Sequence, residues 1–406
     1  MNGLSLIPFH PKVTVITGAN GSGKSTIIRL LARQLGWGYQ ECATPTKNEK
    51  TGLIGFFTRF LPRGWLGKES RSELDLGMEI GSLSYSSGQI GKIVVPAGSG
   101  ATYVPSVSVN VGIRGLHIPA HRPQFLYQAV NQIGTVARTK QDAYNQSFNN
   151  CQQSALSGGT NRSSFVIKET LISWATYGYG NEVIEAETHA RRSFEEFQEI
   201  LKTILPKTLG FKEIAIRKSE VLLICTSGEF MLDACSGGIS ALVDLAWQVF
   251  TFQTDATSPF VVIIDEAENH LHAAMQRSLL PSFMEAFPNA QFIVTTHSPF
   301  IVGSVKDSNV IALDYGVDSR VSSQVLDLVN KASTASEILR DVLGVPLTLP
   351  IWVEHELDAT VEKFVSKEIT EESIKALSDE LKRKHLDHLV PTAITQFLDK
   401  KSGVRG

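Results

Sequence analysis

The sequence predicts an α/β fold with a parallel core sheet, and three observations support this prediction. The apolar run Val13–Thr17 leads into a glycine-rich loop and then a helical pattern. A second apolar run, 260–264, ends in Asp265 and Glu266 without the alternation of a half-exposed strand. Strand and helix patterns then repeat through 291–295. Apolar strands that alternate with helices are typical of a parallel sheet covered on both faces.

The first glycine-rich segment predicts a phosphate-binding loop. It follows a strand, ends in Gly-Lys-Ser-Thr and opens a helix pattern, so backbone N–H groups and a helix N-terminus face an anion. Lys24 is expected to neutralise the β- and γ-phosphates, and the Ser25 hydroxyl to reach Mg²⁺. The predicted nucleotide-binding residues of this loop are Gly18, Asn20, Gly21, Ser22, Gly23, Lys24, Ser25 and Thr26.

The second apolar strand supplies the acids that such a site needs. Asp265 is expected in the Mg²⁺ shell, and Glu266 is expected to polarise the attacking water. Magnesium retains several of its waters and takes few protein carboxylates, so one aspartate is sufficient. Together the two segments predict that the chain binds ATP with Mg²⁺ and hydrolyses it.

Two further motifs occur in a fixed order. Ser236-Gly237-Gly238 lies before Asp265 and opens an amphipathic helix, which makes it a second anion site. One chain needs one phosphate loop per nucleotide, so this site is expected to cap the γ-phosphate held by another subunit. The similar run 156–160 lies in a polar segment without a preceding strand and is rejected. His297 ends the strand after Glu266, where it can bond the γ-phosphate and orient water.

These motifs resemble the ABC-type ATPase superfamily, in its soluble RecF-like and OLD-like branch that includes AAA-type ATPases of bacterial defence systems. The resemblance covers about residues 1–315 and implies a signature at Ser236–Gly238, a catalytic base at Glu266 and a switch histidine at His297. The run 264–272 resembles the Ile-Asp-Glu-Pro-Glu stretch of OLD-like ATPases, with Ala267 in place of the proline. Cys235 and Ile239 also depart from the usual signature.

The resemblance also implies a glutamine that contacts Mg²⁺, and Gln124 is the candidate, so the expected metal ligands are Ser25, Asp265 and Gln124. Arg122, two residues earlier, is a candidate for contact with phosphate or with the partner subunit. No aromatic residue is clearly placed to stack on adenine, although Phe9 or His10 could do so.

Composition adds few constraints. A net charge of −3 and a pI near 6.4 give no overall push toward nucleic acid or membranes. Four scattered cysteines indicate neither a disulfide framework nor a zinc site. The N-terminus lacks the pattern of a signal peptide, and no apolar stretch reaches the roughly 18 residues of a membrane helix. We therefore expect a cytoplasmic protein.

The expected organisation has four parts. Residues 1–124 form the first part of the ATPase with antiparallel strands near 74–80 and 92–95, and 125–210 form a helical insertion with a mobile polar loop at 141–164. Residues 211–330 complete the ATPase. Residues 331–406 form a helical tail with helices near 354–367, 370–385 and 391–400. A nuclease in this tail is not expected, because no Asp-x-Asp pair follows Glu354.

The expected function is that of a nucleotide-gated clamp formed by two copies of the chain. The resemblance implies a sensor or regulator ATPase of an anti-phage complex, such as the Septu type, with a separate effector, an HNH nuclease for example, docked on the C-terminal helices. Two alternatives stay open: a RecF- or SMC-like DNA-repair ATPase, with DNA as partner, and a scaffold that binds nucleotide without hydrolysing it.

Overall fold

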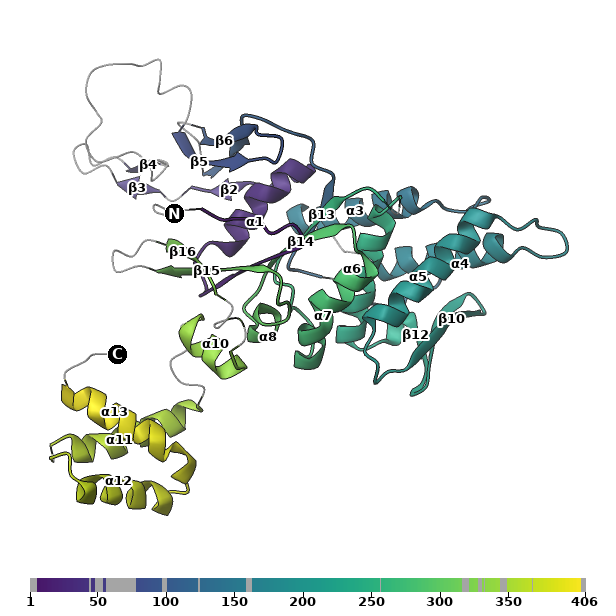
Figure 1. Ribbon diagram of the computed structural model, residues 1–406. Helices are drawn as coiled ribbons and strands as arrows, with labels where there is room; N and C mark the ends of the chain where they lie inside the picture. Colours follow the sequence, from purple (N-terminus) through teal and green to yellow (C-terminus); the bar gives the residue numbers. More distant parts are fainter. Residues whose placement is uncertain are drawn as a thin grey trace, which may run out of the picture. The chain divides into compact units, whose positions relative to one another are not determined.

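A computed structural model describes residues 6–43, 45–47, 54–55, 78–96, 101–122, 125–157, 163–255, 257–315, 321–327, 331, 333–343, 349–366 and 368–402. The chain divides into two compact units, 1–338 and 339–406 (Figure 1). Among the described residues, no helix is both long and apolar enough to cross a membrane.

A six-stranded mixed sheet forms the centre of the first unit. Its strand order is β16-β15-β1-β14-β13-β9. Five strands are parallel, and the edge strand β16 is antiparallel to β15. The predicted α/β class with a parallel core sheet is therefore confirmed, with one antiparallel edge. The strands are β1 (Val13–Gly18), β9 (Gly115–Ile118), β13 (Phe260–Ile264), β14 (Ala290–Thr295), β15 (Asn309–Tyr315) and β16 (Val321–Val325).

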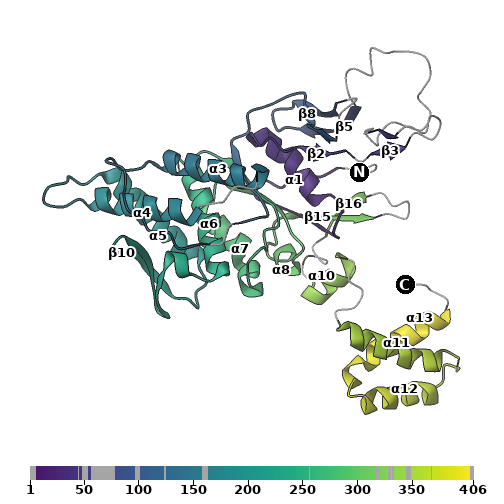
Figure 2. The same ribbon diagram turned by 180° about the vertical axis from the view of Figure 1, so that it is seen from behind.

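Helices cover the sheet on both faces. Helix α1 (Lys24–Ala32), extended by the 3-10 turn η1 (Arg33–Leu35), packs Ile27 and Ile28 onto isoleucines of four parallel strands. Helices α7 (Ala273–Ala286) and α8 (Pro299–Val302) lie on the opposite face in both views (Figures 1 and 2). Burial on both sides explains why these strands are continuously apolar.

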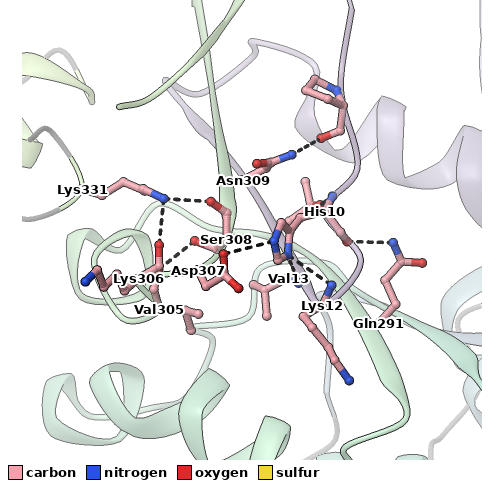
Figure 3. A network of polar contacts seen from close by, with 12 residues as sticks. His10, Lys12, Val13, Gln291, Val305, Lys306, Asp307, Ser308, Asn309 and Lys331 are labelled. Carbon is pink, nitrogen blue, oxygen red and sulfur yellow. Dashed lines mark hydrogen bonds and ion pairs between the residues drawn. The ribbon is translucent and has the colours of Figure 1, made fainter. Parts of the chain in front are cut away.

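The segment that enters β1 is fixed at the end of the strand remote from the glycine-rich loop (Figure 3). The His10 ring nitrogen Nδ1 accepts the N–H groups of Lys12 and Val13, and Nε2 lies 3.4 Å from Asp307. Gln291 donates to the His10 carbonyl oxygen at 2.8 Å. Because the six residues of β1 span about 20 Å, His10 is far from the loop at the other end. The suggestion that His10 stacks on adenine is therefore wrong.

Antiparallel strands form a separate layer near α1. Strands β5 (Met78–Ser84), β6 (Ile90–Val95) and β8 (Ser106–Val107) make a three-stranded sheet, which confirms the predicted hairpin. The turn between β5 and β6 uses Gly88 at φ 81°, in the left-handed region that favours glycine. Two short pairs complete this part: β2 (Glu41–Cys42) with β7 (Thr102–Tyr103), and β3 (Thr46–Lys47) with β4 (Ile54–Gly55). Residues 74–77 of the predicted strand lie outside the described residues.

The predicted mobile loop at 141–164 is wrong for its described part. Residues 140–157 form the regular helix α3 (Lys140–Ser157). Its side chains at Ala143, Ser147 and Cys151 are buried and recur every four residues. The indole N–H of Trp247 donates to the Ser147 hydroxyl at 3.2 Å. Small side chains at helical spacing allow close packing, yet they carry little hydrophobic signal, so the Gln-, Asn- and Ser-rich sequence suggested a loop.

Two more helices and a three-stranded meander complete this region. The helices are α4 (Ser163–Tyr179) and α5 (Thr188–Ile204), and the strands are β10 (Phe211–Arg217), β11 (Glu220–Cys225) and β12 (Gly228–Met231). The short 3-10 turn η2 (Leu232–Ala234) then leads into α6 (Gly237–Phe252). The polar run 156–160 begins with the last two residues of α3, and its remainder lies outside the described residues.

A buried ion pair fixes η2 to the helical region. The Lys168 ammonium on α4 lies 2.6 Å from Asp233 and 2.5 Å from Glu220. Burial lowers the pKa of Lys168, but the hydrogen bonds to these two carboxylates outweigh it, so the pKa is raised overall. The segment just before Ser236 is thus held by charges on three different elements.

The second unit has an apolar core of its own. Helices α11 (Ile351–Val365), α12 (Glu371–Arg383) and α13 (Val390–Ser402) form it, with η3 (Asp387–Leu389) between the last two. Helix α10 (Ala335–Asp341) spans the boundary between the units. Leu377 and Leu381 are fully buried in this core. The three predicted tail helices are confirmed, and these leucines pack within the unit.

Protonation of His117 on β9 should link stability to pH. Burial lowers its pKa from 6.5 to about 3, so the unfolded chain takes up this proton first as pH falls. The stabilisation is complete above pH 6.5 and decreases below it, by about 1.4 kcal/mol per pH unit. His117→Gln should therefore flatten the fall in urea-unfolding free energy between about pH 6.5 and 4.5.

The exposed His189 provides the control, since His189→Gln should leave that pH dependence unchanged. Equal slopes in the wild-type protein and the His117→Gln variant would show that His117 is not the group responsible.

Candidate functional site

The loop after β1 has the backbone of an anion cradle. Gly18, Gly21 and Gly23 have φ values of 140°, 79° and 94°, which L-residues other than glycine rarely adopt. A Cβ at Gly18 would also lie 2.1 Å from the Leu313 carbonyl oxygen on β15. Helix α1 starts at Lys24, directly after Gly23. The loop therefore presents N–H groups and a helix N-terminus at the carboxyl end of β1.

Lys24 lies inside this loop. Its ammonium group donates to the carbonyl oxygens of Gly18 and Ala19 at 2.8 and 2.9 Å. Burial lowers the pKa of Lys24, and the negative charges of Glu266, Glu268 and Asp265 partly restore it. The lysine therefore lies in the electrostatic field of the acidic residues that follow β13.

The strand order brings the two predicted motifs together. Strand β14 lies between β1 and β13, so the carboxyl ends of these three parallel strands form one edge. Asp265 accepts from the Ser25 hydroxyl at 3.4 Å and from the Thr295 hydroxyl at 2.5 Å, both at Oδ1. A serine hydroxyl beside one aspartate is a donor set that fits Mg²⁺ with bound waters. These residues fit the ion that the sequence predicts.

Glu266 occupies a strained backbone position. Its φ is 47°, unusual for a residue with a side chain. Its N–H donates to the Thr295 hydroxyl at 2.8 Å, and its carboxylate accepts from the Asn269 side chain at 2.8 Å. Both contacts fix where the carboxylate points.

His297 follows β14 on the same edge. Its backbone N–H donates to the Glu268 carboxylate at 2.5 Å. Burial and the nearby Lys24 charge lower the pKa of His297, which favours the neutral imidazole. A neutral ring has one donor and one acceptor nitrogen, which suits contact with both a phosphate oxygen and water.

Arg122 is placed differently from the sequence expectation. Its guanidinium is buried and donates to carbonyl oxygens in the turn after β13, at 2.8 Å for Glu266 and 2.9 Å for Asn269. Burial lowers the pKa of Arg122 to about 10, so it remains charged at neutral pH. The side chain thus faces the protein backbone, and the suggestion of a phosphate or partner contact is wrong. Gln124, the other candidate in this segment, lies outside the described residues.

The second anion motif does not join the loop of its own chain. Ser236 precedes the first turn of α6, and its side chain forms no capping hydrogen bond. Ser236 and Gly237 are exposed. Within the part of the chain that the structure describes, no hydrogen bond links residues 236–238 to residues 18–26. The 16-residue helix α6 therefore presents its N-terminus to solvent.

Three residues near the site were missed from the sequence. Thr295 joins β14 to both acids, and Asn269 contacts the Glu266 carboxylate. The Tyr315 hydroxyl lies 3.1 Å from the position of a Cβ built on Gly21, and the ring is 47% exposed. Thr295 could have been found from the sequence, because it places a hydroxyl at the end of a buried strand, at the edge where the site lies. Asn269 and Tyr315 become visible only once the turn and β15 are placed.

Comparisons with known proteins agree with this geometry. A family model described as "AAA domain, putative AbiEii toxin, Type IV TA system" matches residues 238–303, which include Asp265, Glu266 and His297. A second model, "AAA domain", matches residues 2–73, which include the glycine-rich loop. The two models thus match both halves of the site.

Relatives in defence-related systems are also found. The chain is 26% identical to the Septu protein PtuA of Bacillus thuringiensis over 37% of this chain and 42% of that protein. It is 27% identical to the Retron Ec83 probable ATPase of Escherichia coli over 40% of this chain and 30% of that protein. The matches span less than half of the length of each relative.

The chain is also similar to a solved structure, the SMC head domain from Thermotoga maritima. The two are 17% identical with a TM-score of 0.39, over 80% of this chain and 93% of that chain.

Proposed function

We propose that the chain binds ATP with Mg²⁺ and hydrolyses it. The observation that supports this most directly is the meeting of the glycine-rich loop and the two acids at one sheet edge, through the contacts of Asp265 with Ser25 and Thr295. The AAA-type matches agree with nucleotide binding. Phosphoryl transfer to water requires a phosphate-binding loop with a lysine, a hydroxyl group for the metal ion, and acids for the metal ion and the attacking water.

Each residue has a defined part in the proposed reaction. The loop N–H groups and Lys24 hold the β- and γ-phosphates, with Lys24 turning from its own loop carbonyls to the phosphate. Ser25 and Asp265 would hold Mg²⁺, which when bound would neutralise charge on the phosphate oxygens. Glu266 accepts a proton from the attacking water, and the neutral His297 orients that water and bonds the γ-phosphate. The turn that fixes Glu266 determines where this water is activated.

The exposed N-terminus of α6 supports a clamp of two copies. Ser236 and Gly237 carry a helix-end positive potential but are not bonded to their own loop. In a head-to-tail dimer each Ser-Gly-Gly motif would cap the γ-phosphate held by the partner. ATP then holds the copies together, and hydrolysis releases them.

In the cell, we propose a cytoplasmic sensor or regulator ATPase of an anti-phage complex with a separate effector protein, an HNH nuclease for example. The similarity to Septu and retron proteins supports this role. A DNA-repair ATPase would instead show turnover that double-stranded DNA stimulates. A nucleotide-gated scaffold would bind ATP without turnover. Measurement of ATP turnover with and without DNA separates the three.

Glu266→Gln should abolish turnover while leaving ATP binding intact, because an amide cannot accept the proton of the attacking water. The variant should accumulate as an ATP-dependent dimer, which light scattering with and without Mg-ATP measures. Glu285→Gln, on α7 away from the site, is the matched control. Wild-type turnover in Glu266→Gln contradicts the assignment of the base, and a monomer with ATP contradicts the clamp.

Ser236→Arg should abolish turnover and preserve ADP affinity, because it obstructs the site of the partner and not the chain's own loop. Lys24→Ala should also be inactive. In a C2 dimer, an equal mixture of the two should recover about a quarter of wild-type turnover, since half the dimers are mixed and each has one intact site. If mixed dimers form and remain inactive, the proposal of independent shared sites is wrong.

The second unit is proposed as the docking element for the effector. It has a core of its own, and among its described residues the most exposed large hydrophobic one is Trp352, at 67%. Removal of residues 346–406 should preserve ATP turnover but abolish recovery of a co-expressed effector. Trp352→Glu in the full chain should weaken that recovery while circular dichroism stays unchanged. If the shortened chain aggregates or loses its ATPase, the unit is part of the ATPase core and the docking proposal fails.

A further inference from the structure

The turn after β13 is held by one buried arginine. Arg122 has 6% of its surface exposed and follows β9, the neighbour of β13 in the sheet. Its Nη2 donates to the carbonyl oxygens of Asp265 and Glu266 at 3.4 and 2.8 Å. Its Nη1 donates to those of Ala267 and Asn269 at 3.4 and 2.9 Å. One planar group thus contacts four of the five carbonyls from 265 to 269.

These carbonyls need donors because of how the chain turns. Glu266 adopts φ 47°, so its backbone leaves the strand direction, and within the turn its carbonyl oxygen also accepts the Asn269 N–H at 3.1 Å. A buried carbonyl without a partner costs about 1–3 kcal/mol. Arg122 supplies further donors to the carbonyl oxygens of this turn in the strained conformation. The surrounding hydrogen bonds therefore stabilise the strained backbone conformation of Glu266.

The same segment holds the turn at a second point. The Asn269 side-chain amide donates to the Ala120 carbonyl oxygen at 3.0 Å and to the Glu266 carboxylate at 2.8 Å. Residues 120 and 122 therefore fix both the backbone and the carboxylate of Glu266.

A buried acid on the helix that begins after Ser236 interacts electrostatically with this arginine. Asp244 on α6 is 1% exposed, and the Gln248 side chain donates to it at 2.8 Å. The Ser163 hydroxyl on α4 also donates to it. Burial lowers the pKa of Arg122, and electrostatic interactions with Asp244, Glu268, Asp265 and Glu266 partly restore it. Burial also raises the pKa of Asp244 itself.

We propose that Arg122 is a positioning residue that holds Glu266 in the orientation needed to activate water. This rests on the proposed ATP hydrolysis with Glu266 as base. Arg122 contacts the backbone of the turn and not the glycine-rich loop. Its loss should consequently lower kcat and leave nucleotide affinity unchanged.

The test uses Arg122→Lys in the full-length chain, which keeps the charge but lacks the planar fork. A displacement of about 1 Å at a reacting group can cost 10²-fold in rate, so kcat should fall about 100-fold. Affinity for a fluorescent ATP analogue should stay within about 2-fold, since uniform binding is untouched. Arg138→Lys is the control, because Arg138 pairs with Glu169 and Gln146 in the helical region. It should retain wild-type kcat.

A second arm tests whether Arg122 acts through Glu266. In the Glu266→Gln background, Arg122→Lys should lower the residual single-turnover rate by less than about 3-fold, since effects on one unit are not additive. A full 100-fold loss in that background, an unchanged kcat in the single variant, or a parallel loss of ATP affinity would each overturn the proposal.

A third arm does not depend on hydrolysis. The amides of Ala267, Asn269 and Leu271 are hydrogen-bonded within or beside the turn. Their hydrogen exchange should accelerate at least 10-fold in Arg122→Lys, while the amides of β1 stay as protected as in the wild type. Unchanged hydrogen exchange of these three amides in Arg122→Lys would overturn the proposal that Arg122 holds the turn around Glu266. If the wild-type chain hydrolyses no ATP, the proposed function fails, and this arm still decides whether Arg122 holds the turn.

Discussion

The hydroxyl of Thr295 connects the parts on which the site depends. It donates to the Asp265 carboxylate and accepts the N–H of Glu266, so the middle strand of three fixes both acids. A similar bond, from the Thr17 hydroxyl to the Thr296 carbonyl, ties β1 to the same strand end. Because β14 lies between the other two strands, small displacements of either would break these contacts. The positions of loop and acids are therefore set by sheet order and two threonine hydroxyls.

Much of this could be predicted from sequence because the relevant signals are local. The loop 18–26 carries its own backbone requirements, and the run before Asp265 is too apolar for an exposed strand. The role of Arg122 could not be predicted in this way. A charged residue near a phosphate site suggests contact with phosphate, and only burial under the turn after β13 shows that it faces carbonyls. Helix α3 was missed because its buried stripe consists of small residues.

The loop after β1 and the start of α6 differ in how exposed they are to solvent. The loop after β1 is exposed only at Asn20 and Gly21, and its lysine is buried near three acids. The start of α6 is exposed and is preceded by a turn that the buried Lys168–Asp233 pair immobilises. A rigid, exposed helix end loses little conformational entropy when an anion arrives. Asp244, two turns further along α6, is one of the acids that raise the pKa of Arg122.

The position of β1 in the sheet has a consequence for how the protein is made. β1 ends at Gly18, yet both of its neighbours, β14 and β15, come from residues 290–315. At about 5–20 residues per second, a ribosome needs roughly 15–60 s to deliver these partners. Until then an apolar strand and a glycine-rich loop have no sheet to join. The nascent chain therefore carries an unpaired apolar strand through most of its synthesis, a period in which that strand is exposed to aggregation.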